Sequence, residues 1–555
     1  MSNLTRALFE LFRDRFFETG QESAEGGEAR FYQTLGLLAV PGLFVAMFLI
    51  PGFMELAFQP PGPKVDWFLR QHRLFFPTYS FAVVGFATFL EWDRLFPTRQ
   101  DFLLLTPFPI PIRALFLAKL ATLGRFLGLI FIAANAVAVV LMPVFSAWVK
   151  QARMAGVLRL GFAQIVATAL AALFAFFLVA AGQGILINIL SPRLFRRVSP
   201  WLQMTGMSAM VLCLLLFPVW SAGMQPLALA RPDLLRWFPL YWFVGIYDFL
   251  LPTHSPLFEA LGLFGLECLA VAIGIFAVGW FLGFAHYCRR TLESEDLRPP
   301  TVRQNFTLPV ISRILSNPLE RGLFHFAAAT LARSVRHKLF LTTYLSAGFS
   351  FALLSAISVG PSGVIISRDG FRTVPFLLTF FVLSGLRAAF QFPAELASNW
   401  LFQLSATSTR EAGRRATRLL VIVAGLLPLL ALFLPLNVWF WGWNLALQHL
   451  AIEAVAGLLL TEILFWNLDQ VPFTCSWFPG ATNLAVLVGL HLYGFTGYSY
   501  RMGDLEARLD HSPLELALVL AVGVAALTFS WRRQAAADPV RYSGEDAELQ
   551  ILDLT

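Results

Sequence analysis

The chain has 555 residues, of which 57% are hydrophobic and 14% are charged, and its mean hydropathy is +0.67. This composition excludes soluble globular, fibrous and disordered proteins and is typical of a chain that crosses a membrane many times. The net charge of +7 is spread over many loops that would face lipid headgroups, so it does not indicate a nucleic-acid partner.

Apolar runs bounded by charge clusters predict the membrane-spanning helices, because a helix needs about 20 residues to cross the hydrocarbon core. The first set is expected at 34–56, 74–90, 122–147, 161–190, 201–222 and 257–286. A second set is expected at 340–360, 374–391, 418–443, 445–467, 481–498 and 513–531. The predicted fold class is therefore an all-α polytopic membrane protein with about twelve transmembrane helices.

The distribution of Lys and Arg predicts the orientation, because cytoplasmic loops retain positive charge. With the N-terminus inside, the inside segments hold the larger share of these cations. We therefore expect a multi-pass protein of the cell (inner) membrane with both termini in the cytoplasm. The richest inside segment carries Arg289, Arg290, Arg298, Arg303, Arg313, Arg321, Arg333, Arg336 and Lys338.

A hydrophilic stretch with Pro299, Pro300 and Pro309 separates the two sets of spans, as in an internally duplicated membrane protein. We predict two pseudo-repeats of six helices in parallel orientation. The predicted divisions are a first half with an N-terminal interfacial helix over 1–290, a cytoplasmic linker with a second interfacial helix over 291–339, a second half over 340–531 and a cytoplasmic tail over 532–555.

The two interfacial helices are expected at 4–17 and 323–339. In the first, Leu4, Leu8 and Leu11 recur at helical spacing opposite Arg6 and Arg13, as a helix lying in the membrane surface requires. The alternative is an ordinary solvated helix start.

No phosphate-binding loop of the G-x-x-x-x-G-K-[ST] type is present, because none of the lysines Lys64, Lys119, Lys150 and Lys338 follows a glycine. No hydrophilic segment is long enough for a folded nucleotide-binding domain. If ATP powers this protein, a separate ATPase subunit must bind and hydrolyse the ATP. The scattered cysteines Cys213, Cys268, Cys288 and Cys475 predict neither a disulfide framework nor a metal site.

The segment between the second and third predicted spans resembles the permease subunits of ABC-type exporters of the ABC-two class. In those proteins the loop between the second and third spans begins with an acidic residue. A Leu-Leu-x-x-Pro-like core follows, and then a Lys that opens the next span. Pro97 to Asp101 replaces the usual Gly-Thr-Leu-Glu-like stretch, and most members have six spans per chain and dimerise. In the second half, Ser405, Arg418 and Leu419 retain the pattern. The matching residues of the first half are Glu91, Asp101, Leu104, Leu105, Pro107, Pro109, Lys119 and Leu120.

The resemblance implies that each loop folds as a short cytoplasmic coupling helix and docks on an ABC-type ATPase, itself a dimer. ATP and magnesium would then be bound by that partner, and this chain would be a transporter subunit in contact with membrane lipids, with no catalytic residues or cofactor of its own. The alternative for residues 103–108 is a segment lying in the membrane interface. The expected coupling residues also include Arg99 and Arg113 in the first loop, and Phe402, Leu404, Arg410, Glu411, Arg414 and Arg415 in the second.

Ionisable residues inside predicted spans are candidates for a transport pathway, because burying them is costly. Glu267 lies in the sixth span, and His449, Glu453 and Glu462 lie in the tenth. His449 and Glu453 share a helix face and suggest a proton-responsive pair, whereas Glu462 is about half a turn out of phase with Glu453. The alternative is that each is hydrogen-bonded between packed helices or lies near a solvated helix end.

Three functions follow from these features. The leading hypothesis is the permease subunit of an ATP-driven exporter. The second is an ion- or proton-coupled secondary transporter built from two halves. The third, a membrane-embedded lipid-linked transferase, is disfavoured because such sites need an acidic cluster in a sizeable outer loop, and the pair Glu91 and Asp93 falls on the predicted inside.

Overall fold

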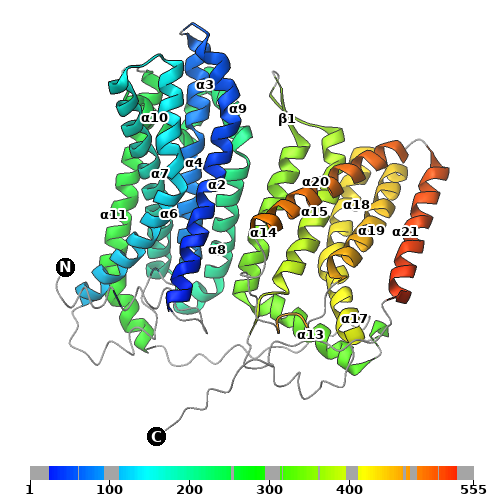
Figure 1. Ribbon diagram of the computed structural model, residues 1–555. Helices are drawn as coiled ribbons and strands as arrows, with labels where there is room; N and C mark the ends of the chain where they lie inside the picture. The colour runs from blue at the N-terminus through cyan, green and yellow to red at the C-terminus, as the bar shows by residue number, and fades with distance from the viewer. Residues whose placement is uncertain are drawn as a thin grey trace. The chain divides into compact units, whose positions relative to one another are not determined.

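The computed structural model divides into two compact helical units, residues 1–298 and 299–555 (Figure 1). Within the described part of the chain, ten helices are long and apolar enough to cross a membrane. The prediction of a helical, polytopic membrane protein is confirmed at this level, and the twelve spans and the duplication stay predictions. The structure describes residues 10, 24–60, 62–92, 95, 112–251, 255–293, 313–315, 317–360, 363–394, 410–466, 471–474, 484–509 and 512–533.

The first unit is built around α4, whose side chains are buried against α6, α7 and α8. Leu74 alone separates α3 from α4, so the two form one spanning segment, Pro63–Leu90. The helices of this unit are α2 (Ala24–Ala57), α3 (Pro63–Arg73), α4 (Phe75–Leu90), α6 (Ile112–Val149), α7 (Met154–Ile189), α8 (Pro192–Leu215), α9 (Phe217–Ala230), the 3₁₀ helix η2 (Pro232–Trp237), α10 (Pro239–Phe249) and α11 (Pro256–Glu293).

Sequence reasoning missed α10, a short helix with an almost fully buried surface. It packs on α11 through Gly245 and Gly262, where the two backbones touch. Small residues allow such close approach between apolar helices. This crossing fixes the position of Asp248, the charged residue of α10.

Gly245→Ala is expected to destabilise the first unit by about 1–3 kcal/mol, because the added methyl group overpacks the α10–α11 crossing. The new Cβ would press on the Phe258 carbonyl oxygen and lie 2.5 Å from the Gly262 nitrogen. Thermal unfolding of the detergent-solubilised chain measures the effect. Gly274→Ala in α11 is the matched control, since a Cβ there meets nothing within 4 Å. Equal unfolding temperatures for both variants would contradict the close crossing.

The second unit surrounds α15, which contacts α14, α18, α19 and α20. A short antiparallel hairpin, β1 (Ile357–Gly360) and β2 (Gly363–Ile366), joins α14 to α15 and pairs Ile357 with Ile366. The remaining elements of this unit are α13 (Pro318–Arg333), α14 (Val335–Ala356), α15 (Arg368–Ala389), α17 (Arg410–Val421), the π turn η4 (Ile422–Leu426), α18 (Leu427–Trp441), α19 (Trp443–Phe465), α20 (Leu484–Leu509) and α21 (Pro513–Arg533).

The second predicted interfacial helix, 323–339, is divided in the structure. α13 ends at Arg333, and Ser334 caps α14 by accepting a hydrogen bond from the His337 backbone N–H. A serine that satisfies a free N–H at a helix start ends one helix and begins another, and this signal outweighs the continuous apolar spacing. α13 lies across the ends of α14 and α17 (Figure 1). Residues 4–17 lie outside the described residues except Glu10.

Candidate functional site

The predicted coupling residues fall into three groups. Glu91 at the end of α4, Lys119 in α6, and Arg414 and Arg415 in α17 are described with their side chains. For Arg113 in α6 and for Arg410 and Glu411 in α17, the structure describes the backbone but not the side chains. The others, Arg99, Asp101, Leu104, Leu105, Pro107, Phe402 and Leu404, lie outside the described residues.

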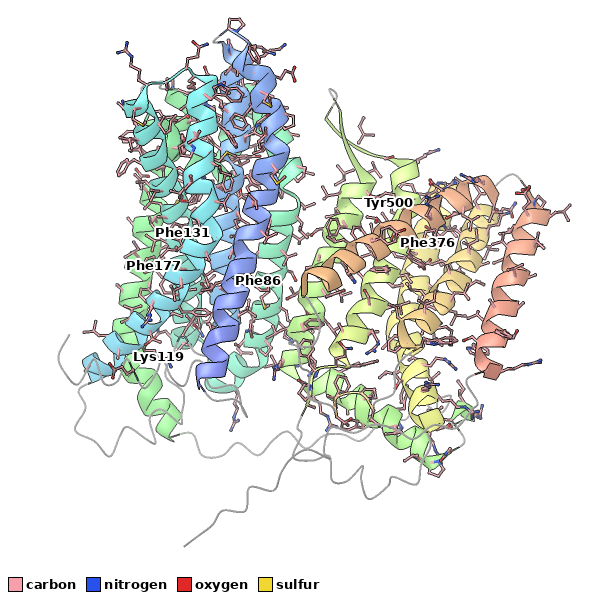
Figure 2. All side chains as sticks on the ribbon, viewed as in Figure 1. Phe86, Lys119, Phe131, Phe177, Phe376 and Tyr500 are labelled. Carbon is pink, nitrogen blue, oxygen red and sulfur yellow. The ribbon has the colours of Figure 1, made fainter. Side chains whose placement is uncertain are left out.

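Lys119 is buried near the beginning of α6, at the lower end of the first unit in Figure 2. Its side chain lines a small apolar cavity with Leu95, Phe176 and Phe276. A lysine places its methylene groups against apolar surface while its ammonium group reaches a polar edge. The cation that follows the first candidate loop is thus enclosed by the bundle.

Arg418, the cation that follows the second candidate loop, is held by Glu462 from α19. Its Nε donates to Glu462 Oε1 at 2.6 Å and its Nη2 donates to Oε2 at 2.9 Å, a two-point guanidinium–carboxylate pair. Ser530 and Trp531 of α21 each donate to the same carboxylate at 3.0 Å. Glu462 therefore ties α17, α19 and α21 together, which agrees with the interhelical alternative given above.

Arg415 links α17 to α13 through an ion pair, with 3.6 Å between its Nη1 and Glu320 Oε1. Glu320 is buried, but the Arg415 side chain is 57% exposed. Because the arginine is exposed to solvent, this ion pair contributes little to stability. It nevertheless joins the end of the second candidate loop to the helix that lies across the unit.

His449 and Glu453 lie at the centre of what we call the α19 polar cluster: Thr379, His449, Glu453, Tyr498 and Glu506. His449 Nδ1 is 2.6 Å from Glu506 Oε1 of α20, and Thr379 Oγ1 of α15 donates to Glu453 Oε1 at 3.2 Å. All three ionisable side chains are buried, His449 and Glu453 completely. The partner of His449 is thus Glu506, from a different helix, and not Glu453.

The α19 polar cluster is enclosed by aromatic rings. Phe376 lies 5.3 Å and Trp441 lies 5.8 Å from the His449 ring, measured between ring centres. Phe376 lies inside the bundle of the second unit in Figure 2. Within the described residues, His449 Nε2, Glu453 Oε2, Tyr498 Oη and Glu506 Oε2 are buried with no hydrogen-bond partner. Each unpaired buried polar atom costs about 1–3 kcal/mol, and their concentration here makes this cluster the candidate site of the second unit.

Glu267 does not belong to this cluster. It lies on the exposed side of α11 in the first unit, on a surface that also carries Leu263 and Val271, which are 50% and 60% exposed. Of the three predicted residues on α19, His449 and Glu453 lie in the α19 polar cluster, and Glu462 is bound by Arg418.

A second group of charges, in the first unit, escaped sequence reasoning. Asp248 of α10 accepts from Arg70 Nε at 2.6 Å and from Arg73 Nη1 at 3.5 Å, both of α3. In the same unit, Lys150 Nζ lies 3.4 Å from Asp66 Oδ1 and forms an ion pair with it. Burial lowers the pKa of Lys150 and Arg73 lowers it further, while Asp66 raises it. The basic end of α3, with Arg70, His72 and Arg73, lies between the spans predicted at 34–56 and 74–90 and belongs to neither.

Comparison with known protein families, curated proteins and solved structures gives no match for this chain. Among the described residues, no group of three or more His, Cys, Asp or Glu side chains is arranged to hold a metal ion. The site must therefore be interpreted from its own geometry.

Proposed function

We propose that this chain is the membrane-embedded permease subunit of an ATP-driven exporter, coupled through two cytoplasmic loops to a separate dimeric ATPase. The observation that supports this proposal is the matching position of the loops. One lies between α4 and α6 and the other between α15 and α17, and each is followed by an enclosed cation, Lys119 or Arg418.

The helices that follow the loops are suited to transmit motion. α17, η4 and α18 continue from Arg410 to Trp441 without a break, and α6 runs from Ile112 to Val149. Displacement of a loop would therefore move a whole span as a rigid body. Arg418 would pass the motion to α19 and α21 through Glu462. Closure of the ATPase dimer would pull both loops, and the resulting movement of the helices would open a path to the outside.

The double variant Leu104→Asp with Phe402→Asp is expected to lose the ATPase partner. Two carboxylates in an apolar interface cost on the order of 2 kcal/mol, which is a roughly 30-fold loss of affinity. The full chain, purified in mild detergent, is assayed for Mg²⁺-dependent ATPase activity and for the copurifying subunit.

The control is Leu104→Ile with Phe402→Leu, which keeps both positions apolar and should retain the partner. An unchanged yield of ATPase with the two aspartates would remove the loops from the interface. ATP hydrolysis by the isolated chain would contradict the proposal as a whole.

The α19 polar cluster favours a second candidate, a proton-coupled secondary transporter, because buried ionisable groups in a span are typical of ion pathways. This candidate requires that vesicles with the purified chain alone move an apolar substrate in response to a pH gradient. The exporter requires ATP and the second subunit in the same vesicles. The two requirements separate the candidates.

A further inference from the structure

The α19 polar cluster holds more ionisable groups than it can keep charged. Glu453 is the eleventh of the 23 residues of α19 and lies deep in an apolar span. It faces Glu506 from α20 and His449 from the preceding turn of its own helix. With His449 protonated and both carboxylates ionised, these three side chains carry one uncompensated negative charge.

Among the described residues, no Arg or Lys side chain is paired with Glu453 or Glu506. α18 has no ionisable residue, and Glu462 of α19 is engaged by Arg418. On α15, Arg387 donates to the Leu464 carbonyl oxygen, and Arg372 is half-buried and lies 6.0 Å from the centre of the Trp441 ring. The remaining ionisable groups on α15, α20 and α21 are Arg368, Asp369, His491, Tyr493, Tyr500, Arg501, Asp504, Arg508, Glu515, Arg532 and Arg533.

The hydrogen bonds divide the three ionisable groups into a pair and a single group. The His449–Glu506 contact of 2.6 Å is short enough for a charge-assisted hydrogen bond. Glu453 receives only the hydroxyl of Thr379, a donor that serves a neutral carboxyl group as well as an ionised one. Its second oxygen has no partner among the described residues. An unpaired carboxylate is far more costly to bury than an unpaired neutral carboxyl group.

We propose that Glu453 is a proton-binding site of the second unit, neutral in the packed bundle and held by Thr379 beside the hydrogen-bonded His449–Glu506 pair. Release of its proton would place a second negative charge next to Glu506 and loosen the packing of α19 on α15 and α20. The site thereby links the protonation of one carboxyl group to helix packing. This proposal does not depend on which energy source drives the protein.

Infrared spectroscopy of the full-length protein at neutral pH tests the site directly. A protonated carboxyl group gives a C=O stretching band separate from that of carboxylates, and Glu453→Gln should remove it. Glu462→Gln is the control and should leave the band in place, because Glu462 is ion-paired with Arg418. Thr379→Val should shift the band without removing it, which keeps the test valid if the glutamine variant does not fold. The absence of the band in the wild type, or its persistence in Glu453→Gln, would overturn the proposal.

The pH dependence of unfolding gives a second readout. If the folded chain binds one proton at Glu453 that the unfolded chain releases, the wild type loses stability as pH rises above the ordinary carboxyl range. Relative to Glu453→Gln, its unfolding equilibrium should shift toward the unfolded state by about tenfold per pH unit. Parallel profiles would contradict the proposal. A sodium site would give a different result: Na⁺ would stabilise the wild type more than choline does, and Glu453→Gln would abolish this difference. That result would overturn the proton-site proposal.

Discussion

Glu462→Ala is expected to lower the free energy of unfolding by about 3–5 kcal/mol, because it leaves a largely enclosed guanidinium group without its counter-ion. The substitution removes both bonds to Arg418 and the acceptors of Ser530 and Trp531. The side chains of Arg418 and Glu462 are only 24% and 8% exposed, so solvent screens the pair weakly. Unfolding of the detergent-solubilised chain by titration with SDS measures the change.

Two further variants make this prediction specific. Glu515→Ala removes an exposed carboxylate from the beginning of α21 and should change the free energy of unfolding by less than about 0.5 kcal/mol. Glu462→Gln retains a carbonyl acceptor and should cost less than the alanine substitution. If Glu462→Ala matches Glu515→Ala, Glu462 does not hold α17, α19 and α21 together.

Long apolar helices could be predicted from the sequence because a run of about 20 apolar residues is a local signal. α11 covers the run from which it was predicted, and α7 covers its run except Leu190. α10 could not be found in this way, because its 11 residues are too short to span and are buried by their neighbours. The break between α13 and α14 was also missed, because its only sequence signal is the capping residue Ser334 within an otherwise helical pattern.

Polar partners were harder to predict than helices, because they depend on which spans pack together. His449 and Glu453 were identified as candidates, but Glu506 lies 57 residues from His449. Arg70 and Asp248 are 178 residues apart. The half-turn offset of Glu462 from Glu453 was a local property, and it agrees with their contacts to different helices.

Asp248→Ala is expected to destabilise the first unit by about 3–5 kcal/mol, because one carboxylate binds two enclosed arginines. Asp248 is 1% exposed, and the Arg73 guanidinium also lies 4.6 Å from the centre of the Tyr247 ring. Without Asp248, the charge of Arg73 is left against an aromatic ring and beside Lys150. SDS titration and thermal unfolding of the full chain measure the loss.

Asp233→Ala is the control for Asp248→Ala, because Asp233 is an exposed aspartate in the neighbouring η2 and its loss should be nearly neutral. The double variant Asp248→Ala with Arg73→Met should recover part of the stability lost in Asp248→Ala, since it removes the stranded charge while keeping apolar volume. A double variant less stable than Asp248→Ala would show that Arg73 stabilises α3 by packing on Tyr247 and not through its charge. An Asp248→Ala variant as stable as the wild type would exclude the α3–α10 ion pair as a structural link.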